Sequence, residues 1–260
     1  MTNQTAVDYH LEDQVIVITG AAQGIGAACA QRFAQDGAAV ALWDVNDNAA
    51  RALAQTLTQR GQRATAIQCD VSRKADVDAA LAATLGQFGR VDALINNAGI
   101  FKAANFLDIT EADWDAVLNV NLRGAFLVAQ AVARTMVQGG KGGAIVHMSS
   151  VNSVLAIPNI ASYNVSKGGI NQLTRVMAIA LAEHGIRVNA VGPGPIRTDM
   201  LEESLTRMGA ERAEAFIKSV PLGRMGETAE IAEAVAFLVS DAASYMTGQI
   251  VFVNGGGPGG

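Results

Sequence analysis

The sequence has few of the features that mark disulfide-rich, membrane-spanning or secreted proteins. Its two cysteines, Cys29 and Cys69, each lie in an apolar pattern, which indicates buried free thiols rather than a disulfide framework. No apolar run reaches the roughly 18 residues of a membrane-spanning helix. The polar residues 1–14 lack the apolar core of a signal peptide. We therefore expect a cytoplasmic protein without a membrane segment.

Basic clusters, metal-ligand spacings and a hydrolase motif are also missing. The net charge is -5 and no run of Lys or Arg occurs, so neither nucleic acid nor an anionic membrane surface is an expected partner. His10, His147 and His184 have no metal-ligand spacing to another His or Cys, so we predict no metal site. No Gly-x-Ser-x-Gly sequence supports a hydrolase.

The chain does have enough apolar residues for a large core and a surplus of glycine. Of its 260 residues, 50% are hydrophobic and 27 are Gly, and we expect a single domain over residues 1–260. Apolar runs of strand composition alternate with helical patterns, without hairpin turns. This alternation predicts an α/β fold, a three-layer doubly wound parallel sheet with helices on both faces. The predicted strands, about seven, cover 15–19, 38–43, 64–68, 91–95, 144–148, 186–191 and 250–253.

A glycine-rich turn over residues 19–26 (Thr-Gly-Ala-Ala-Gln-Gly-Ile-Gly) joins the first predicted strand to a helix. Gly20 permits a tight turn, Gly24 lets a pyrophosphate approach the backbone, and Gly26 lets the helix pack closely on the strand. The helix N-terminus then presents free N–H groups to the phosphates. In this strand–turn–helix context the pattern predicts a dinucleotide site.

Asp44 ends the second predicted strand, 18 residues beyond Gly26. A carboxylate at this spacing accepts hydrogen bonds from the adenosine ribose hydroxyls and repels a 2′-phosphate. The neighbouring Gln23 and Val45 are uncharged, so the sequence favours NAD over NADP. The alternative is that Asp44 caps the helix that starts near Asp47.

Other polar residues also end strands. Asp70, Asn96 and Ser150 follow the third, fourth and fifth predicted strands, and ligands of a parallel sheet bind at these carboxyl ends. Asn121 interrupts the apolar stripe of a long helix predicted over 111–137. A buried amide needs partners, which leaves a structural and a functional reading of Asn121 open.

Lys167 follows Tyr163 by four positions, which places both side chains on one face of a helix. A free phenol has a pKa of about 10, and an ammonium one turn away favours the phenolate and lowers that pKa. The pair can therefore give and take a proton near neutral pH. A half-buried Tyr beside a solvated Lys has the same spacing, so the neighbouring motifs decide the interpretation.

The segment after Gly192-Pro193-Gly194-Pro195, around residues 195–220, is charged and has apolar residues at helical spacing. We interpret it as a mobile substrate lid, and a surface helical excursion is the alternative. The tail from Gly255 is nearly all Gly and Pro and is predicted to be loosely ordered.

Taken together, these motifs resemble the short-chain dehydrogenase/reductase family over nearly the whole chain, in its single-domain Rossmann-type branch. The Ser150–Tyr163 gap of 13 residues is typical of that family. The resemblance is carried by Thr19, Gly20, Gly24, Gly26, Asp70, the Asn96–Gly99 run, Asn121, Ser150, Tyr163, Lys167, Pro193, Gly194, Thr198, Gly255 and Gly256. One departure is Asn254, where relatives often have Asp.

The resemblance implies a catalytic tetrad. Tyr163 would be the general acid/base, and Lys167 would bind the nicotinamide ribose and lower the pKa of Tyr163. Ser150 would hold the substrate oxygen, and Asn121 would anchor a water that relays protons to Lys167. The predicted cofactor-binding residues are Gly20, Gln23, Gly24, Ile25, Gly26, Asp44, Asp70, Val71, Asn96, Ala98, Gly99, Tyr163, Lys167, Pro193, Ile196 and Thr198.

The implied function is an NAD(H)-dependent oxidoreductase that acts on a small secondary alcohol, polyol or sugar, or the matching ketone. A homo-oligomer, tetramer or dimer, is also implied. A 3-oxoacyl-thioester reductase that uses an acyl carrier protein or coenzyme A is the alternative, and Lys141 and His184 lie where the resemblance would place part of a docking patch. A dinucleotide-sensing protein without turnover is a third hypothesis, which the complete tetrad disfavours.

Overall fold

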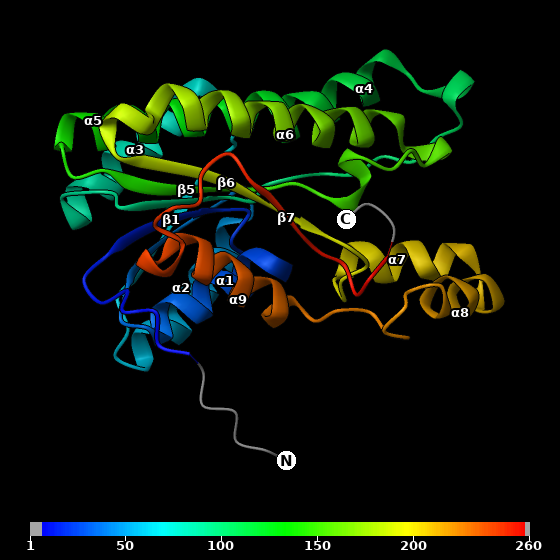
Figure 1. Ribbon diagram of the computed structural model, residues 1–260, viewed down its shortest axis with the longest axis horizontal. Helices are drawn as coiled ribbons and strands as arrows, with labels where there is room; N and C mark the ends of the chain where they lie inside the picture. The colour runs from blue at the N-terminus through cyan, green and yellow to red at the C-terminus, as the bar shows by residue number, and fades with distance from the viewer. Residues whose placement is uncertain (1–6, 258–260) are drawn as a thin grey trace.

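Seven parallel strands form one sheet in the computed structural model, which describes residues 7–257 (Figure 1). Their order is β3-β2-β1-β4-β5-β6-β7. Each predicted strand is present with its ends within two residues of the expected ones. The strands are β1 (Val15–Thr19), β2 (Ala39–Asp44), β3 (Ala64–Gln68), β4 (Ala93–Asn96), β5 (Gly143–Met148), β6 (Ile186–Pro193) and β7 (Ile250–Val253).

Helices cover both faces of this sheet (Figure 1), as the alternation of patterns predicts. One face carries α1 (Gly24–Gln35), α2 (Asp47–Gln59) and α9 (Thr228–Val239), and the other carries α3 (Lys74–Phe88), α4 (Glu111–Leu118), α5 (Ala125–Gly139) and α6 (Ala161–Leu181). Successive residues of β1 enter different cores, since Ile16 and Ile18 pack with the first group and Val17 with the second. The three-layer doubly wound fold is thus confirmed.

The long helix predicted over 111–137 is interrupted. A π-helical turn, Asn119–Gly124, separates α4 from α5. At its centre Asn121 is buried, and its amide bonds the backbone N–H and C=O of Ile100 at 2.8 and 2.9 Å. Apolar periodicity could not indicate this change of register, because it depends on a segment 21 residues away.

The same stretch, Glu111–Gly139, is the one helix of the described residues that is long and apolar enough to cross a membrane. Of its most apolar window, 56% is buried inside the molecule. Since a buried core helix passes the same test of length and composition, this helix carries no membrane assignment.

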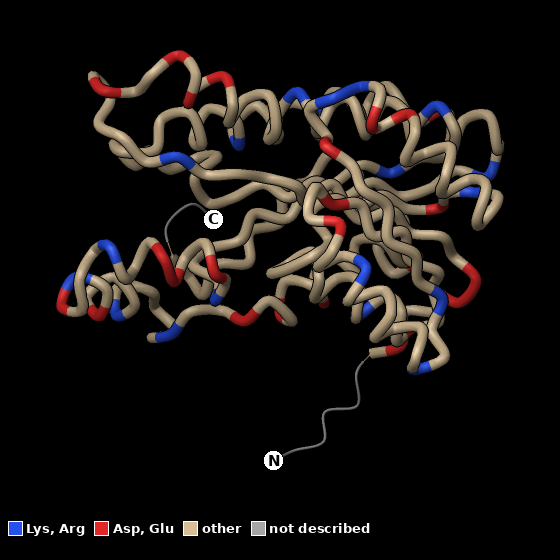
Figure 2. Tube along the Cα trace, turned by 180° about the vertical axis from the view of Figure 1, so that it is seen from behind, with Lys and Arg blue, Asp and Glu red and all other residues tan. Residues whose placement is uncertain are grey.

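The segment predicted as a lid contains two helices, α7 (Asp199–Met208) and α8 (Ala210–Lys218). Neither helix has a buried residue. They lie together at one end of the molecule (Figure 1), and basic and acidic residues are interspersed along them (Figure 2).

The strand order reverses direction between β1 and β4, which is where a doubly wound sheet opens a crevice for ligands. Thr19 is paired with Trp43 on one side and with Asn96 on the other. The residues that follow these positions therefore meet at one edge of the sheet.

The described part of the C-terminal tail is hydrogen-bonded, contrary to the prediction of loose order. The C=O of Gly255 accepts from the N–H of Leu222, and the Asn254 amide donates to the C=O of Gly257 at 2.7 Å. The remainder of the predicted tail, 258–260, lies outside the described residues.

Candidate active site

The glycine turn after β1 is shaped by backbone contacts. Gly20 and Gly24 have φ angles of +61° and +56°, which favour glycine. A Cβ on Gly26 would lie 2.0 Å from the carbonyl oxygen of Gly20, so the start of α1 packs against the turn as predicted. At Gly24 the nearest atom to such a Cβ is a methyl carbon of Thr198 at 3.6 Å, and the backbone there stays open to a ligand.

Asp44 lies at the carboxyl end of β2, beside that turn. Its carboxylate accepts hydrogen bonds from the backbone N–H groups of Ala22 and Asn46, both at 2.8 Å. Asn46, rather than Asp44, caps α2, since its side chain accepts from the N–H of Ala49. The capping alternative for Asp44 is therefore wrong. The two bonds fix the carboxylate and leave it further lone pairs for hydroxyl groups.

Thr19 and Asn97 join the glycine turn to the loop after β4. The Thr19 hydroxyl accepts from the N–H groups of Asn97 and Ala98 at 2.9 and 3.0 Å. The Asn97 amide donates to the carbonyls of Thr19 and Gly20, both at 3.0 Å. Neither residue was predicted as a site residue, although both belong to the quoted motifs.

The side chain of Asn96, a predicted cofactor-binding residue, makes its hydrogen bonds within the protein. Its amide is 5% exposed and donates to the carbonyl of Ala125 at 2.7 Å. Its oxygen faces the Thr19 hydroxyl at 3.4 Å. The Asn96 side chain thus braces β4 against α5 and β1, and only its backbone can contact a dinucleotide.

Asp70 and Val71 follow β3 on the same edge of the sheet. The Asp70 carboxylate accepts from the N–H and the hydroxyl of Ser72 at 3.0 and 2.7 Å. Val71 is buried against Gly124, where an added Cβ would lie 2.8 Å from the Val71 methyl. Gly99 lies beside Asn121, since a Cβ on Gly99 would be 3.4 Å from the amide oxygen. These residues lie together as predicted.

Tyr163 and Lys167 occupy adjacent turns of α6, and the Lys167 ammonium lies 5.5 Å from the Tyr163 ring centroid. Lys167 is 4% exposed and donates to the backbone carbonyl of Met148 at 2.7 Å. Phe101, which sequence reasoning did not single out, meets the Tyr163 ring edge-on at 5.9 Å. Ser150 follows β5, and its hydroxyl accepts from the N–H of Asn152 at 3.1 Å.

The protonation of this pair differs from the expectation in one respect. Burial raises the pKa of Tyr163, and a hydrogen bond with Ser150 lowers it by less. In the protein alone the pKa of Tyr163 is therefore raised, not lowered as the sequence led us to expect. Burial lowers the pKa of Lys167 to about 8, which leaves the ammonium mostly protonated at neutral pH.

Asn121 uses its side chain within the protein. Besides Ile100, its amide donates to the Ser166 hydroxyl at 3.1 Å, on the turn of α6 between Tyr163 and Lys167. Both amide hydrogens are thereby used, and a water at this position would bond the second lone pair of the amide oxygen or the backbone. The π-helical turn allows this, because a change from α to π register releases backbone groups from their usual partners.

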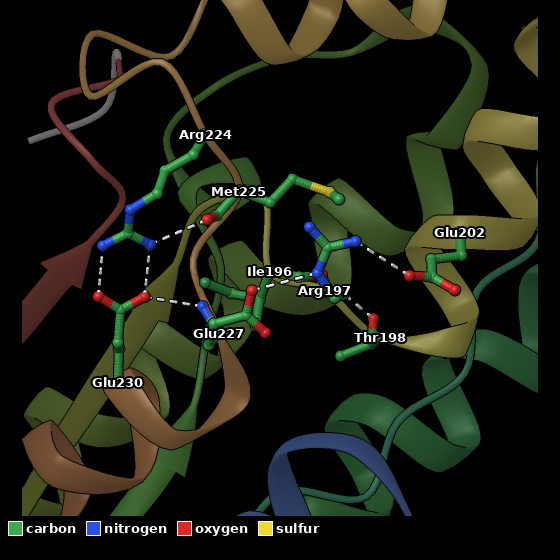
Figure 3. Close-up of polar contacts among 8 residues, drawn as sticks. All are labelled: Ile196, Arg197, Thr198, Glu202, Arg224, Met225, Glu227 and Glu230. Atoms are coloured by element: carbon green, nitrogen blue, oxygen red, sulfur yellow. Dashed lines mark hydrogen bonds and ion pairs between the residues drawn. The ribbon is translucent and has the colours of Figure 1, made fainter. Parts of the chain in front are cut away.

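Pro193 ends β6, and Ile196 and Thr198 follow it and lead into α7. Ile196 forms a parallel bridge with Gly226, and the Thr198 hydroxyl caps α7. Salt bridges lie around this β-bridge (Figure 3). Arg197 pairs with Glu202 and Glu227, and Arg224 pairs with Glu230. Arg224 and the backbone N–H of Glu227 lower the pKa of Glu230 to about 2. The two ends of the segment are thereby joined at its base.

The residues fit a dinucleotide. An open glycine backbone faces the N-terminus of α1, a fixed carboxylate lies at the ribose position, and the Tyr163–Lys167 pair lies on the carboxyl edge of the sheet. Fold and site define the class as a dinucleotide-binding oxidoreductase of the Rossmann type.

The chain belongs to the short-chain dehydrogenase/reductase family. A family model described as enoyl-(acyl carrier protein) reductase matches residues 20–257. A (2S)-[(R)-hydroxy(phenyl)methyl]succinyl-CoA dehydrogenase subunit of Thauera aromatica is 39% identical over 247 residues, 95% of this chain and 97% of the relative. A D-threitol dehydrogenase of Mycolicibacterium smegmatis is 38% identical and covers 96% and 94%.

Among solved structures, the crystal structure of levodione reductase is similar throughout, with a TM-score of 0.91 and 38% identity. The match covers 94% of this chain and 97% of that one. The family and fold predicted from the motifs are confirmed. Members of this family bind a nicotinamide dinucleotide and small-molecule substrates and are commonly oligomeric.

Proposed function

We propose that this protein is an NAD(H)-dependent oxidoreductase that interconverts a small secondary alcohol, polyol or sugar and the matching ketone. The observation that carries the proposal is the Tyr163–Lys167 pair on α6, with Ser150 beside it, on the same edge of the sheet as the glycine turn. It is a proton-transfer site beside a dinucleotide site.

The bound nicotinamide supplies or accepts the hydride. In oxidation, Tyr163 takes the proton of the substrate hydroxyl while Ser150 holds the substrate oxygen by a hydrogen bond. Lys167 adds positive charge close to the phenol, and this charge favours the phenolate. In reduction, Tyr163 returns the proton to the developing alkoxide. Asn121 holds the Ile100 backbone and the Ser166 hydroxyl and keeps the start of α6 in place.

The choice of NAD over NADP is supported by Asp44. Its fixed carboxylate, with Gln23 and Val45 as uncharged neighbours, suits two ribose hydroxyls and repels a 2′-phosphate. The remaining predicted contacts, from Gly20, Ile25, Ala98, Pro193 and Thr198, belong to the same proposal.

A small uncharged substrate is supported by the charges around the site. The basic side chains Arg197, Arg207, Lys218 and Arg224 each form a salt bridge with a glutamate in the segment 196–230. They are therefore poorly placed to attract a phosphate-bearing carrier. We assign this segment the role of substrate lid within a single 1–260 domain.

The second candidate is a reductase of 3-oxoacyl thioesters, favoured by the similarity to the succinyl-CoA dehydrogenase subunit of Thauera aromatica. Lys141 is exposed, and His184 lies 3.8 Å from Glu183. A docking patch for an acidic carrier would need positive charge on both Lys141 and His184, whereas the Glu183 carboxylate offsets part of that charge. A dinucleotide sensor without turnover is the remaining hypothesis, and the complete tetrad disfavours it.

Assembly and location are part of the same proposal. Helices α5 and α6 border an apolar groove of about 410 Å³ that includes Phe126 and Val176, which are 42% and 63% exposed. An exposed apolar surface of this kind suits an interface with further copies of the chain, in a dimer or tetramer. We propose a cytoplasmic homo-oligomer without nucleic-acid or membrane partners.

The test is a screen of NAD reduction and NADH oxidation over sugars, polyols, hydroxy acids, ketones and 3-oxoacyl thioesters. It is repeated with Tyr163→Phe and with the control Tyr245→Phe, at an exposed tyrosine. Tyr163→Phe is expected to bind NAD normally and to lose about 10²- to 10⁴-fold in turnover. A variant that retains more than about a tenth of the rate would contradict the role of Tyr163.

A further inference from the structure

A third polar residue lies on the same helix as the Tyr163–Lys167 pair. Asn171 follows Lys167 by one turn of α6, is 5% exposed, and takes no part in the proton transfer described above. Its side chain points toward the segment that contains Ser150, because all its side-chain bonds go to neighbours of that serine.

Three hydrogen bonds, closed by the peptide bond between Ser149 and Ser150, form a ring. The Ser149 hydroxyl donates to the Asn171 amide oxygen at 2.6 Å. The Asn171 amide nitrogen donates to the Ser153 hydroxyl at 2.8 Å, and that hydroxyl donates to the backbone carbonyl of Ser150 at 2.6 Å. Since each hydroxyl has one proton, the ring also fixes the orientation of the amide, with its oxygen toward Ser149.

Through the ring, Asn171 is hydrogen-bonded to residues on both sides of Ser150. Ser149 immediately precedes it, and Ser153 ends the 3₁₀ turn Val151–Ser153 that Ser150 caps. That turn holds the Ser150 hydroxyl by one N–H, from Asn152. Without Asn171, Ser149 and Ser153 would each lose a partner inside the protein. The end of β5 would keep the hydrogen bond from Lys167 to Met148, but Ser149 and the Ser150 turn would lose their side-chain bonds to Asn171.

We propose that Asn171 is a positioning residue which, through Ser149 and Ser153, holds the Ser150 hydroxyl against the hydroxyl of Tyr163. The inference rests on the proposed function, because it gives Asn171 a task in the same reaction. Tyr163 and Asn171 lie on one helix, so the ring, together with the Lys167–Met148 hydrogen bond, holds the Ser150 turn against that helix.

A purely structural role would give a different result. Because the Ser150 hydrogen bond lowers the pKa of Tyr163, a displaced Ser150 would raise that pKa. The ascending limb of the kcat–pH profile for alcohol oxidation would then move to higher pH. Loss of stability alone would leave the limb in place.

The experiment compares Asn171→Ala, Ser153→Ala and Ser150→Ala, with Asn189→Ala as the matched control. Asn189 is also a buried amide, but it bonds Met246 and Gln249 on the far side of β6. We expect Asn171→Ala to lower kcat about tenfold, less than the roughly hundredfold loss that a misplacement of about 1 Å can cause. The KM for NAD should stay unchanged, and the ascending limb of the kcat–pH profile should move to higher pH.

Ser153→Ala should move the limb in the same direction. Ser153→Thr, which keeps the hydroxyl, should return the limb to its original pH.

A double-mutant cycle gives the sharpest result. In the Ser150→Ala background, Asn171→Ala should cause no further loss of kcat, because its effect passes through Ser150. Equal losses in both backgrounds, or an unmoved pH limb in both Asn171→Ala and Ser153→Ala, would overturn the inference. So would an equal shift of the limb in Asn189→Ala.

Failure of the proposed function has its own signature. If Ser150→Ala and Tyr163→Phe turn over as fast as the unmodified protein, the proposed function is wrong. If both are impaired while the ring variants keep the original pH limb, only the role of Asn171 is wrong. Should Asn171→Ala not fold, Ser153→Ala tests the same ring, and ultraviolet titration of Tyr163, with Tyr163→Phe subtracted, reads its pKa without turnover.

Discussion

The side of the crevice that we propose binds the dinucleotide and the side that we propose binds substrate are built differently. On the dinucleotide side, the backbone is closely packed. A Cβ added to Gly20 would lie 2.9 Å from the Cα of Ala98, and a Cβ added to Gly26 would lie 2.0 Å from the carbonyl oxygen of Gly20. On the substrate side, α7 and α8 bury no residue, and the exposed apolar side chains Met200 and Met208 lie on α7. One side is constrained by close backbone packing, and the other by surface side chains.

This difference teaches why the cofactor is easier to infer than the substrate. Phosphates and ribose hydroxyls are recognised by N–H groups, a helix terminus and one carboxylate, which require particular residue types at fixed spacing. A substrate wall made of exposed side chains tolerates many residue types, because each contributes little to folding. The following variants test this contrast, in order of expected effect.

Gly26→Ala should have the largest effect. Its Cβ would overlap the Gly20 carbonyl oxygen, so α1 must move away from the turn. We expect turnover to fall by about a hundredfold, as a misplacement of about 1 Å can cause, together with weaker NAD binding and a lower melting temperature. Steady-state kinetics, calorimetric NAD titration and thermal unfolding measure these three effects.

Gly86→Ala is the matched control for that variant, since it lies inside α3 with no atom within 4 Å of the added Cβ. It should be neutral or stabilise by up to about 1 kcal/mol. Wild-type NAD affinity in Gly26→Ala would show that the dinucleotide side is less constrained than we argue.

Asp44→Arg should change the cofactor preference. The substitution removes an acceptor for two ribose hydroxyls and offers a cation to a 2′-phosphate. With about 1.5–3 kcal/mol for a charged hydrogen bond, the NAD/NADP ratio of kcat/KM should fall by about 10- to 100-fold. Asp47→Asn, in the adjacent helix, should leave the ratio unchanged. An unchanged ratio in Asp44→Arg would defeat the ribose assignment.

His147 lies on β5 inside the sheet, and variants at this position test the pH dependence of folding stability rather than ligand binding. It is fully buried, and neither ring nitrogen has a hydrogen-bond partner among residues 7–257. Burial, followed by the nearby Lys167, lowers its pKa to about 4. The unfolded chain then binds more protons than the folded one below pH 6.5 or so, and acid destabilises the protein.

We expect this histidine to cost about 2 kcal/mol of unfolding free energy between pH 7 and pH 5. Urea unfolding across this range measures the loss. His147→Leu should remove that part of the pH dependence, whereas His184→Gln, at an exposed histidine, should not. An identical acid dependence in His147→Leu would refute the explanation.

Met200→Ala should have the smallest effect and should act only on the proposed substrate side. Removing this 44% exposed side chain from α7 is expected to change KM for the substrate about threefold, less than the roughly 1–3 kcal/mol ascribed to contacts in an enclosed apolar pocket. KM for NAD should not change. A larger effect on NAD than on substrate would show that the two sides are not separable in this way.

Several features could be predicted from sequence because they depend on local chemistry. The alternation of strand and helix patterns, the glycine turn, and the spacing of Tyr163 and Lys167 each depend on residues close together in the chain. The protonation of Tyr163 could not, because burial outweighs the Ser150 hydrogen bond, and burial is a property of the packed molecule. The roles of Asn46 and Asn96 likewise required knowledge of which atoms they reach.

The sequence by itself determined the parallel sheet, the family and the residue types proposed to bind a dinucleotide, since periodicity and glycine requirements are read along the chain. Only the tertiary structure decided the π-helical turn at Asn121, the salt bridges at the base of the proposed lid, and the ring that joins Asn171 to the Ser150 turn. The physical reason is that a hydrogen bond between distant segments depends on a meeting of side chains that no local pattern records.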